Sequence, residues 1–161
     1  MHAHGHPPRH PRWAQRLFSE PDFAAITEAI ARAEAETSAE IRVHLERRVH
    51  RLPGQRADAL RRARNVFAHL GMHLTAHHHG VLIYLAIQDR KLAIVGDEGI
   101  HARVGDQYWE TVRDLMIAKL REGRPLDAVL AGIAEVGSVL AEHFSRRPDD
   151  ENELSDHVSV R

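Results

Sequence analysis

The segment over residues 80–101 constrains the fold of this chain more than any other feature. Residues 81–87 are apolar without alternation, which is typical of a strand that is covered on both faces of a sheet. A short polar reversal separates it from a second apolar strand at residues 92–95, which ends in an acidic, glycine-flanked turn at residues 96–99. Because a hairpin returns the chain to its starting point, we expect this turn to lie beside the histidines at 77–79.

The rest of the chain alternates between helical and strand patterns. Residues 41–46 alternate between apolar and polar side chains, which predicts a strand with one buried and one solvent-exposed face. Apolar residues at helical spacing predict four helices, over residues 19–37, 60–70, 104–116 and 126–144.

These elements follow one another in the order αβαββαα. The first two strands and the helix between them form a crossover unit, which should be parallel and right-handed. The third strand should pair antiparallel with the second because a tight reversal joins them, and helices must cover both faces of the sheet. The predicted fold class is therefore α/β, a three-layer α/β/α sandwich around a small mixed sheet.

Length predicts one folded domain, because 161 residues lie within the usual size of a single domain. We expect an arm rich in histidine and proline over residues 1–18 to be disordered. The folded domain should cover residues 19–145, followed by a polar C-terminal tail over residues 146–161.

Composition excludes several classes of site and partner. The chain has no cysteine, so disulfides, thiolate metal sites and cysteine nucleophiles are ruled out. The formal net charge of −1 gives no overall field for nucleic acid or anionic membranes. No apolar run reaches the ~20 residues that span a bilayer, and the N-terminus lacks the pattern of a secretory signal. We therefore expect a cytoplasmic monomer that binds neither nucleic acid nor membrane.

Strand polarity predicts one acidic, histidine-rich end of the sheet. The first two strands begin at this end and the third strand finishes there, so residues from three separate segments should meet. The candidate metal ligands are Asp97, Glu98, Glu40, His78, His79 and Asp106. The opposite end should be basic, with Arg47, Arg48, His50, Asp89, Arg90 and Lys91.

Several kinds of site fit the residues at the acidic end. Carboxylates and exposed carbonyls suit Ca²⁺, whereas imidazoles suit Zn²⁺ or Ni²⁺. The acids also fit a structural role, since negative charge stabilises the N-terminus of the following helix. The histidines fit a solvated loop, although His69, His73 and His77 would share one face of a helix that continued through Gly71.

Five different short motifs follow one another along the chain. They read Thr-Ser-Ala-Glu-Ile-Arg-Val at residues 37–43, Leu-Gly-Met at 70–72, Gly-Val-Leu-Ile at 80–83, Asp-Arg-Lys at 89–91 and Gly-Asp-Glu-Gly-Ile at 96–100. In this pattern the chain resembles the TPM domain family, most closely its small, single-domain bacterial members.

The resemblance implies an α/β/α sandwich that binds a divalent cation, calcium in particular, at acidic loops beside the sheet. It also implies acid phosphatase activity, which is reported for plant members. Many members carry Asp-Asn or Asp-Gly before the central strand, where this chain has His78 and His79 before Gly80. The missing carboxylate opens a transition-metal alternative.

Two functions from different classes follow. The first is a binding or accessory module that holds a divalent cation at the acidic end, together with a protein partner or a phosphorylated ligand. The alternative is a metal-assisted acid phosphatase acting on phosphomonoesters, with Asp97 and Glu98 as ligands and Asp106 or a histidine as general base. A third hypothesis is an adaptor that uses the arginines expected on the exposed face of helix 60–70, namely Arg56, Arg61, Arg62 and Arg64.

Overall fold

The computed structural model describes residues 10–72, 79–145 and 158–160. The helices in these ranges are α1 (Arg12–Gln15), α2 (Glu20–Glu34), α3 (Ala59–His69), α4 (Glu98–Val104), α5 (Asp106–Arg121) and α6 (Pro125–His143). The strands are β1 (Glu40–Glu46), β2 (Gly80–Ala86), β3 (Lys91–Gly96) and β4 (Ser159–Val160). No helix within the described ranges combines the length and the apolar character needed to cross a membrane.

The strands form one mixed sheet in the order β3-β2-β1-β4. β1 and β2 run parallel, with Glu40 opposite Gly80, and β3 pairs antiparallel with β2. The predicted crossover and hairpin are therefore confirmed. β4 adds parallel to the other side of β1, a pairing that the sequence pattern did not predict.

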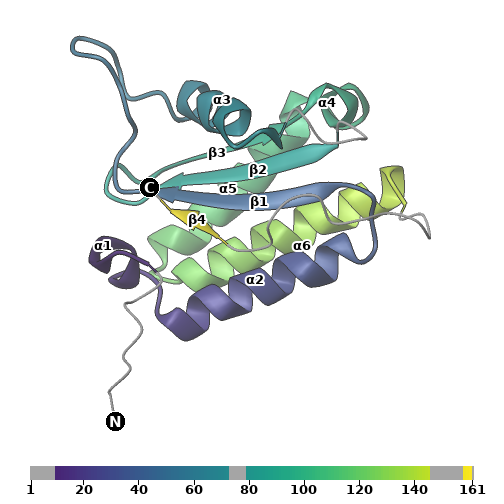
Figure 1. Ribbon diagram of the computed structural model, residues 1–161, viewed down its shortest axis with the longest axis horizontal. Helices are drawn as coiled ribbons and strands as arrows, with labels where there is room; N and C mark the ends of the chain where they lie inside the picture. The colour runs from purple at the N-terminus through teal and green to yellow at the C-terminus, as the bar shows by residue number, and fades with distance from the viewer. Residues whose placement is uncertain (1–9, 73–78, 146–157, 161) are drawn as a thin grey trace.

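Helices cover both faces of this sheet, so the predicted α/β/α sandwich is confirmed (Figure 1). On one face, α2, α5 and α6 share an apolar core with alternate strand residues such as Val43, Ile83 and Ile94. On the other face, α3 contributes Val66 to a second, smaller core with Leu82. Complete coverage explains why β2 is buried along its whole length.

Two predicted helix boundaries follow directly from local chemistry. At the start of α2, the Ser19 side chain accepts the N–H of Asp22 at 3.1 Å, and the Asp22 carboxylate accepts the N–H of Ser19 at 3.0 Å. This reciprocal pair satisfies two of the helix N–H groups that have no partner inside the helix. Just beyond α3, Gly71 has φ +72°, a left-handed conformation that glycine adopts without steric cost.

The prediction that β1 exposes one face to solvent is wrong. His44 is 3% exposed and Glu46 is 1% exposed, although both alternate with the apolar residues of the strand. α3 lies over this face, and Arg62 from α3 bonds Glu46. An alternating polar pattern therefore marks a buried polar face here, because the helix above it carries a matching charge.

The predicted limits of the folded domain are too narrow at both ends. Within the arm expected to be disordered, Phe18 is fully buried and the His10 ring stacks on Phe23 with 3.6 Å between ring centroids. Within the expected polar tail, Val158 joins the main apolar core and Ser159 pairs opposite His44. The domain therefore includes residues 10–18 and 158–160.

Candidate functional site

Three segments meet at Gly80, the first residue of β2. The N–H of Glu40 donates to the carbonyl of His79 at 2.8 Å, and the N–H of Asp97 donates to the carbonyl of Gly80 at 3.0 Å. Glu40, His79 and Asp97 therefore lie around the same strand terminus, as strand polarity predicted.

Asp97 is a buried carboxylate that ties two elements together. Its Oδ2 accepts the N–H of Gly80 at 2.7 Å, and its Oδ1 accepts the N–H of Ile100 at 3.1 Å, which caps α4. Burial raises the pKa of Asp97, while the N–H donors and the neighbouring His79 act in the opposite direction. Across the described ranges, no Lys or Arg forms an ion pair with this carboxylate. Asp97 therefore joins the start of β2 to the start of α4 through its hydrogen bonds. No Lys or Arg side chain in the described ranges compensates its charge.

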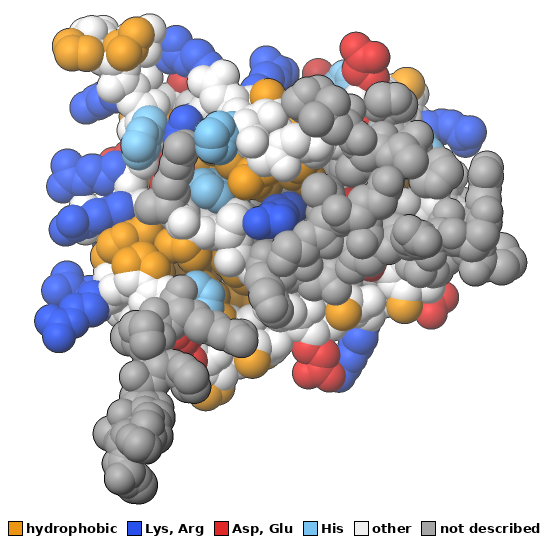
Figure 2. Space-filling view, in the orientation of Figure 1, with side chains coloured by type: hydrophobic (Ala, Val, Ile, Leu, Met, Phe, Trp, Pro, Cys, Tyr) orange, Lys and Arg blue, Asp and Glu red, His pale blue; other side chains and the backbone are white. Residues whose placement is uncertain are grey.

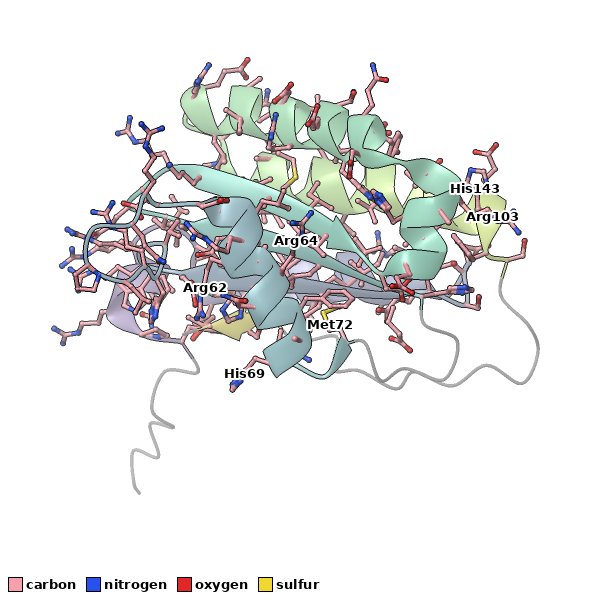
Figure 3. The ribbon with its side chains drawn as sticks, turned by 90° about the horizontal axis from the view of Figure 1, so that it is seen from above. Arg62, Arg64, His69, Met72, Arg103 and His143 are labelled. Carbon is pink, nitrogen blue, oxygen red and sulfur yellow. The ribbon has the colours of Figure 1, made fainter. Side chains whose placement is uncertain are left out.

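An aromatic side chain packs against His79. The His79 ring lies 4.1 Å from the ring of Phe144, measured between centroids. The guanidinium carbon of Arg103 lies 5.9 Å from the centroid of the same Phe144 ring, and Figure 3 shows Arg103 at the same end of the molecule as His143. The acidic end thus also carries a guanidinium, which the sequence did not lead us to predict.

The other two predicted acids lie in a separate, exposed place. Glu98 and Asp106 line a hollow of about 210 Å³ together with His101, and the Asp106 carboxylate lies 3.4 Å from His101 Nδ1. The residues that line this hollow do not include Glu40, His79 or Asp97. The predicted ligand set therefore divides into a buried group at Gly80 and an exposed group at the start of α4 and α5.

The predicted ligand His78 lies outside the described ranges, as do His73 and His77 of the histidine-rich segment. His69 is the last residue of α3, so the helix ends before Gly71, as the sequence predicted, and does not continue through it. Within the ranges that the structure covers, no three His, Asp or Glu side chains are arranged to hold a metal ion. Strand polarity therefore located the point where Glu40, His79 and Asp97 meet, and their role as metal ligands stays a prediction.

The opposite end of the sheet is basic, as predicted. Figure 2 shows Lys and Arg side chains gathered on the left of the view, where β1 ends in Figure 1. The loop after β1 contacts the β2–β3 hairpin there, because Arg48 donates to Gln88 at 2.8 Å and the N–H of Val49 donates to Asp89 at 2.7 Å.

A second buried carboxylate, Glu46, was missed by the sequence analysis. Arg62 donates to both of its oxygens, with Nε at 2.9 Å from Oε1 and a terminal nitrogen at 2.6 Å from Oε2. The Tyr84 hydroxyl donates to Oε1 at 2.7 Å, and His44 Nε2 lies 3.3 Å from Oε2. Although burial opposes ionisation, the hydrogen bonds from Arg62, His44 and Tyr84 hold the pKa of Glu46 well below its usual range.

This polar cluster joins β4 to the sheet. It also shows that Arg62 does not belong to the exposed arginine face that was predicted for α3. His44 Nδ1 lies 2.7 Å from the Ser159 hydroxyl, so the cluster reaches from α3 across β1 to β4. Arg62 points into the cluster rather than to solvent, whereas Arg64 leaves α3 on its other side (Figure 3). Helical spacing held a signal for this, because Arg62 lies one turn before the buried Val66.

Comparison with known proteins gives a consistent family. A family model described as the TPM domain matches residues 14–139. Among solved structures, the chain is similar to the NMR structure of the BA42 protein from the psychrophilic bacterium Bizionia argentinensis, with 36% sequence identity and a TM-score of 0.78. The match covers 89% of this chain and 94% of that chain.

A second solved structure supports the fold alone. The N-terminal domain of a protein from P. gingivalis has 17% sequence identity and a TM-score of 0.64, with coverage of 81% of this chain and 82% of that chain. The comparison with curated proteins gave no match.

Proposed function

The chain belongs to the TPM domain family, and from that membership we propose that it is a binding module that holds a divalent cation at the end of the sheet around Gly80. Its role would be to bind rather than to catalyse, with the cation as one part of a recognition surface. Its location in the cytoplasm, its monomeric state and its indifference to nucleic acid remain predictions.

The observation that carries this proposal is the burial of the Asp97 carboxyl group beside Gly80. Burial raises the pKa of this carboxyl, which means that the surroundings disfavour its ionised form. A buried carboxylate is normally compensated by a cationic group, and no Lys or Arg in the described ranges forms an ion pair with it. A divalent cation would supply that compensation.

The donors near Gly80 fit a partly hydrated hard cation better than a fully enclosed one. A carboxylate has about four acceptor positions, and the two N–H bonds to Asp97 leave others available. Mg²⁺ is commonly bound through one or two carboxylates with several waters retained. Glu40 supplies a second buried carboxylate at the same strand terminus, whereas a Zn²⁺ or Ni²⁺ site would need further imidazoles beside His79.

A metal-assisted phosphatase is the second candidate, and Arg103 is the observation that favours it. A guanidinium near a cation can bind phosphoryl oxygens, and Arg103 lies at the acidic end of the molecule (Figure 3). Asp106, which the sequence suggested as general base beside a histidine alternative, instead pairs with His101 at the exposed hollow. We therefore rank binding above hydrolysis.

The test is thermal unfolding with and without CaCl₂, MgCl₂ and ZnCl₂. A cation present at about 100 times its dissociation constant stabilises the folded state by ~2.7 kcal/mol, which corresponds to a rise in Tm of about 5–10 °C for a chain of this size. The chain should be compared with a version that lacks residues 1–9, since their histidines bind transition metals non-specifically. That version keeps His10, which stacks on Phe23.

The matched variants are Asp97→Asn and Glu98→Gln. Asp97→Asn should abolish the rise in Tm, and Glu98→Gln should keep it because Glu98 is exposed. A rise that is equal in both variants would contradict the site. Hydrolysis of p-nitrophenyl phosphate that depends on Asp97 and on added cation would favour the phosphatase instead.

A further inference from the structure

The two edges of the sheet differ in how their backbone groups are satisfied. At the β1 edge, the Glu34 carboxylate accepts the N–H of Ile41 at 2.6 Å, and β4 pairs with β1 opposite His44 and Leu45. At the other edge, β3 has only β2 as a neighbour in the described sheet. An unpaired edge is a template for the addition of another strand.

The register identifies the backbone groups that face outward from β3. Residues of an antiparallel strand alternately bond their neighbour and point away from it. The N–H of Asp97 bonds Gly80 in β2, so Val95 and Ala93 also face β2. The N–H and carbonyl groups of Gly96, Ile94 and Leu92 therefore face the open edge, and no hydrogen bond to them occurs elsewhere in the described ranges.

A groove lies along this edge, between the start of α3 and the face of α5. Its cavity of about 670 Å³ is floored by Leu92, Ala93 and Ile94 and walled by Leu60 and Trp109, among others. Leu60 is 43% exposed, so the wall offers apolar surface. The groove continues past Ile94 into the smaller hollow at Gly96, so it follows the outward-facing backbone groups of β3.

Three arginine side chains line the groove without an acidic partner in the described ranges. Arg56, Arg64 and Arg90 line the cavity, and their guanidinium groups form no ion pair or hydrogen bond with any part of the chain that the structure describes. The acids of the lining are Asp58, 4.0 Å from Arg61, Asp114, 3.2 Å from Arg113, Asp106, 3.4 Å from His101, and Glu110. Against these four acids the lining carries five Lys and Arg side chains, namely Arg56, Arg64, Arg90, Lys91 and Arg113. The groove is therefore complementary to a segment that carries carboxylates.

We propose that the open edge of β3 binds an extended acidic peptide from a partner protein as a fifth strand. Backbone bonds to Leu92 and Ile94 would supply affinity, apolar side chains would pack on Leu60, and acidic side chains would pair with Arg56 and Arg64. This is the mode of recognition in which a peptide extends an exposed sheet edge. The proposal does not depend on a cation at Asp97, because Asp97 lines neither the groove nor the smaller hollow.

The test uses the full chain and a fluorescein-labelled synthetic octapeptide of alternating Val and Glu, measured by fluorescence anisotropy. Backbone amide resonances are followed by NMR in parallel. We expect saturable binding, with the largest shifts at the amides of Leu92, Ile94 and Gly96. Methylation of alternate peptide nitrogens should weaken binding by about tenfold or more, because each hydrogen bond contributes about 1 kcal/mol.

Protein variants separate backbone pairing from charge. Arg56→Glu with Arg64→Glu should weaken binding by about tenfold or more, since opposite charges become like charges, and both side chains are exposed, so the fold should persist. The matched control is Arg32→Glu on α2, which should leave binding unchanged. Equal binding of the N-methylated peptide, equal binding of a Val-Lys peptide, or shifts confined to other residues would overturn the proposal. Concentration-dependent dimerisation with the same amide shifts would also overturn it, because the edge would then serve a second copy of this chain.

Discussion

Glu46 and Asp97 are both buried carboxylates at strand ends, yet their surroundings differ in kind. Glu46 is held by a guanidinium, a phenol and an imidazole, whereas Asp97 is held by backbone N–H groups. The pKa of Glu46 is accordingly lowered and that of Asp97 is raised. The charge of Glu46 is compensated by the guanidinium of Arg62. No Lys or Arg in the described ranges compensates Asp97 in this way, so its carboxylate is available to a bound cation. This difference is why we place the cation at Asp97.

The largest expected effect is that of Glu46→Gln on stability. Removing this charge leaves Arg62 unpaired, with its side chain only 12% exposed, and breaking a buried ion pair costs about 3–5 kcal/mol. The free energy of unfolding in urea measures this loss. Glu28→Gln is the control, because its pair with Arg32 is exposed and should cost less than about 0.5 kcal/mol.

Asp97→Asn should have the next largest effect on stability. The amide nitrogen would face one of the two N–H donors, from Gly80 or Ile100, and leave it unsatisfied at a cost of about 1–3 kcal/mol. Urea denaturation of the cation-free protein measures this loss. Glu98→Gln should stay within about 0.5 kcal/mol of the parent. If Asp97→Asn cost as much as Glu46→Gln, the proposed difference between the two carboxylates would be wrong.

Lowering the pH should change the stability costs of Glu46→Gln and Asp97→Asn in opposite directions. The folded-state pKa of Glu46 lies below its ordinary value of 4.5, so its stabilisation is present above pH 4.5 and decreases as the pH falls below that value. The folded-state pKa of Asp97 lies above its ordinary value of 3.8, so its favourable contribution is present below pH 3.8 and is lost as the pH rises. Between pH 7 and pH 3 the cost of Glu46→Gln should shrink by roughly 1–2 kcal/mol, and the cost of Asp97→Asn should grow. Chemical denaturation at both values measures the changes, and changes of the same sign would contradict the assigned shifts.

Tyr84→Phe should give the smallest of these effects. It removes one hydrogen bond to Glu46 and leaves the bonds from Arg62, so we expect a loss of about 1 kcal/mol. Tyr108→Phe is the matched control because its hydroxyl bonds the Glu135 carbonyl at an exposed position, at 3.0 Å, and should cost less. A larger loss for Tyr108→Phe, measured by urea denaturation, would show that the buried cluster does not depend on the phenol.

The sequence predicted the position of Asp97 but not that of Glu46, for a physical reason. Asp97 follows from strand polarity, because a hairpin and a parallel crossover together fix which strand ends meet. The surroundings of Glu46 depend on a helix that covers the face of β1, and an alternating pattern is the same for a solvated face and for a buried polar one. The signal for this burial is Arg62, a charged residue that helical spacing places on the face of α3 that covers the sheet.

Short elements were also beyond the sequence pattern. β4 has only the residues Ser159 and Val160, and α1 spans one turn, so neither is long enough to show a period. α4 was not predicted, because the sequence pattern placed a turn at residues 96–99 and the next helix from residue 104, whereas Gly105 with φ +82° separates α4 from α5. Their placement comes from tertiary contacts such as the one between His44 and Ser159.

The closure of the β1 edge by Glu34 and β4 has a consequence for self-association. Growth of a sheet from molecule to molecule needs a strand edge on two sides of every subunit, and in the described sheet the edge opposite β3 is β4, a strand of only two residues. Copies that joined through β3 would form a closed two-fold pair, with only the short β4 edge left in the described sheet to recruit a third. Misassembly at high concentration would therefore stop at dimers and not proceed to fibrils.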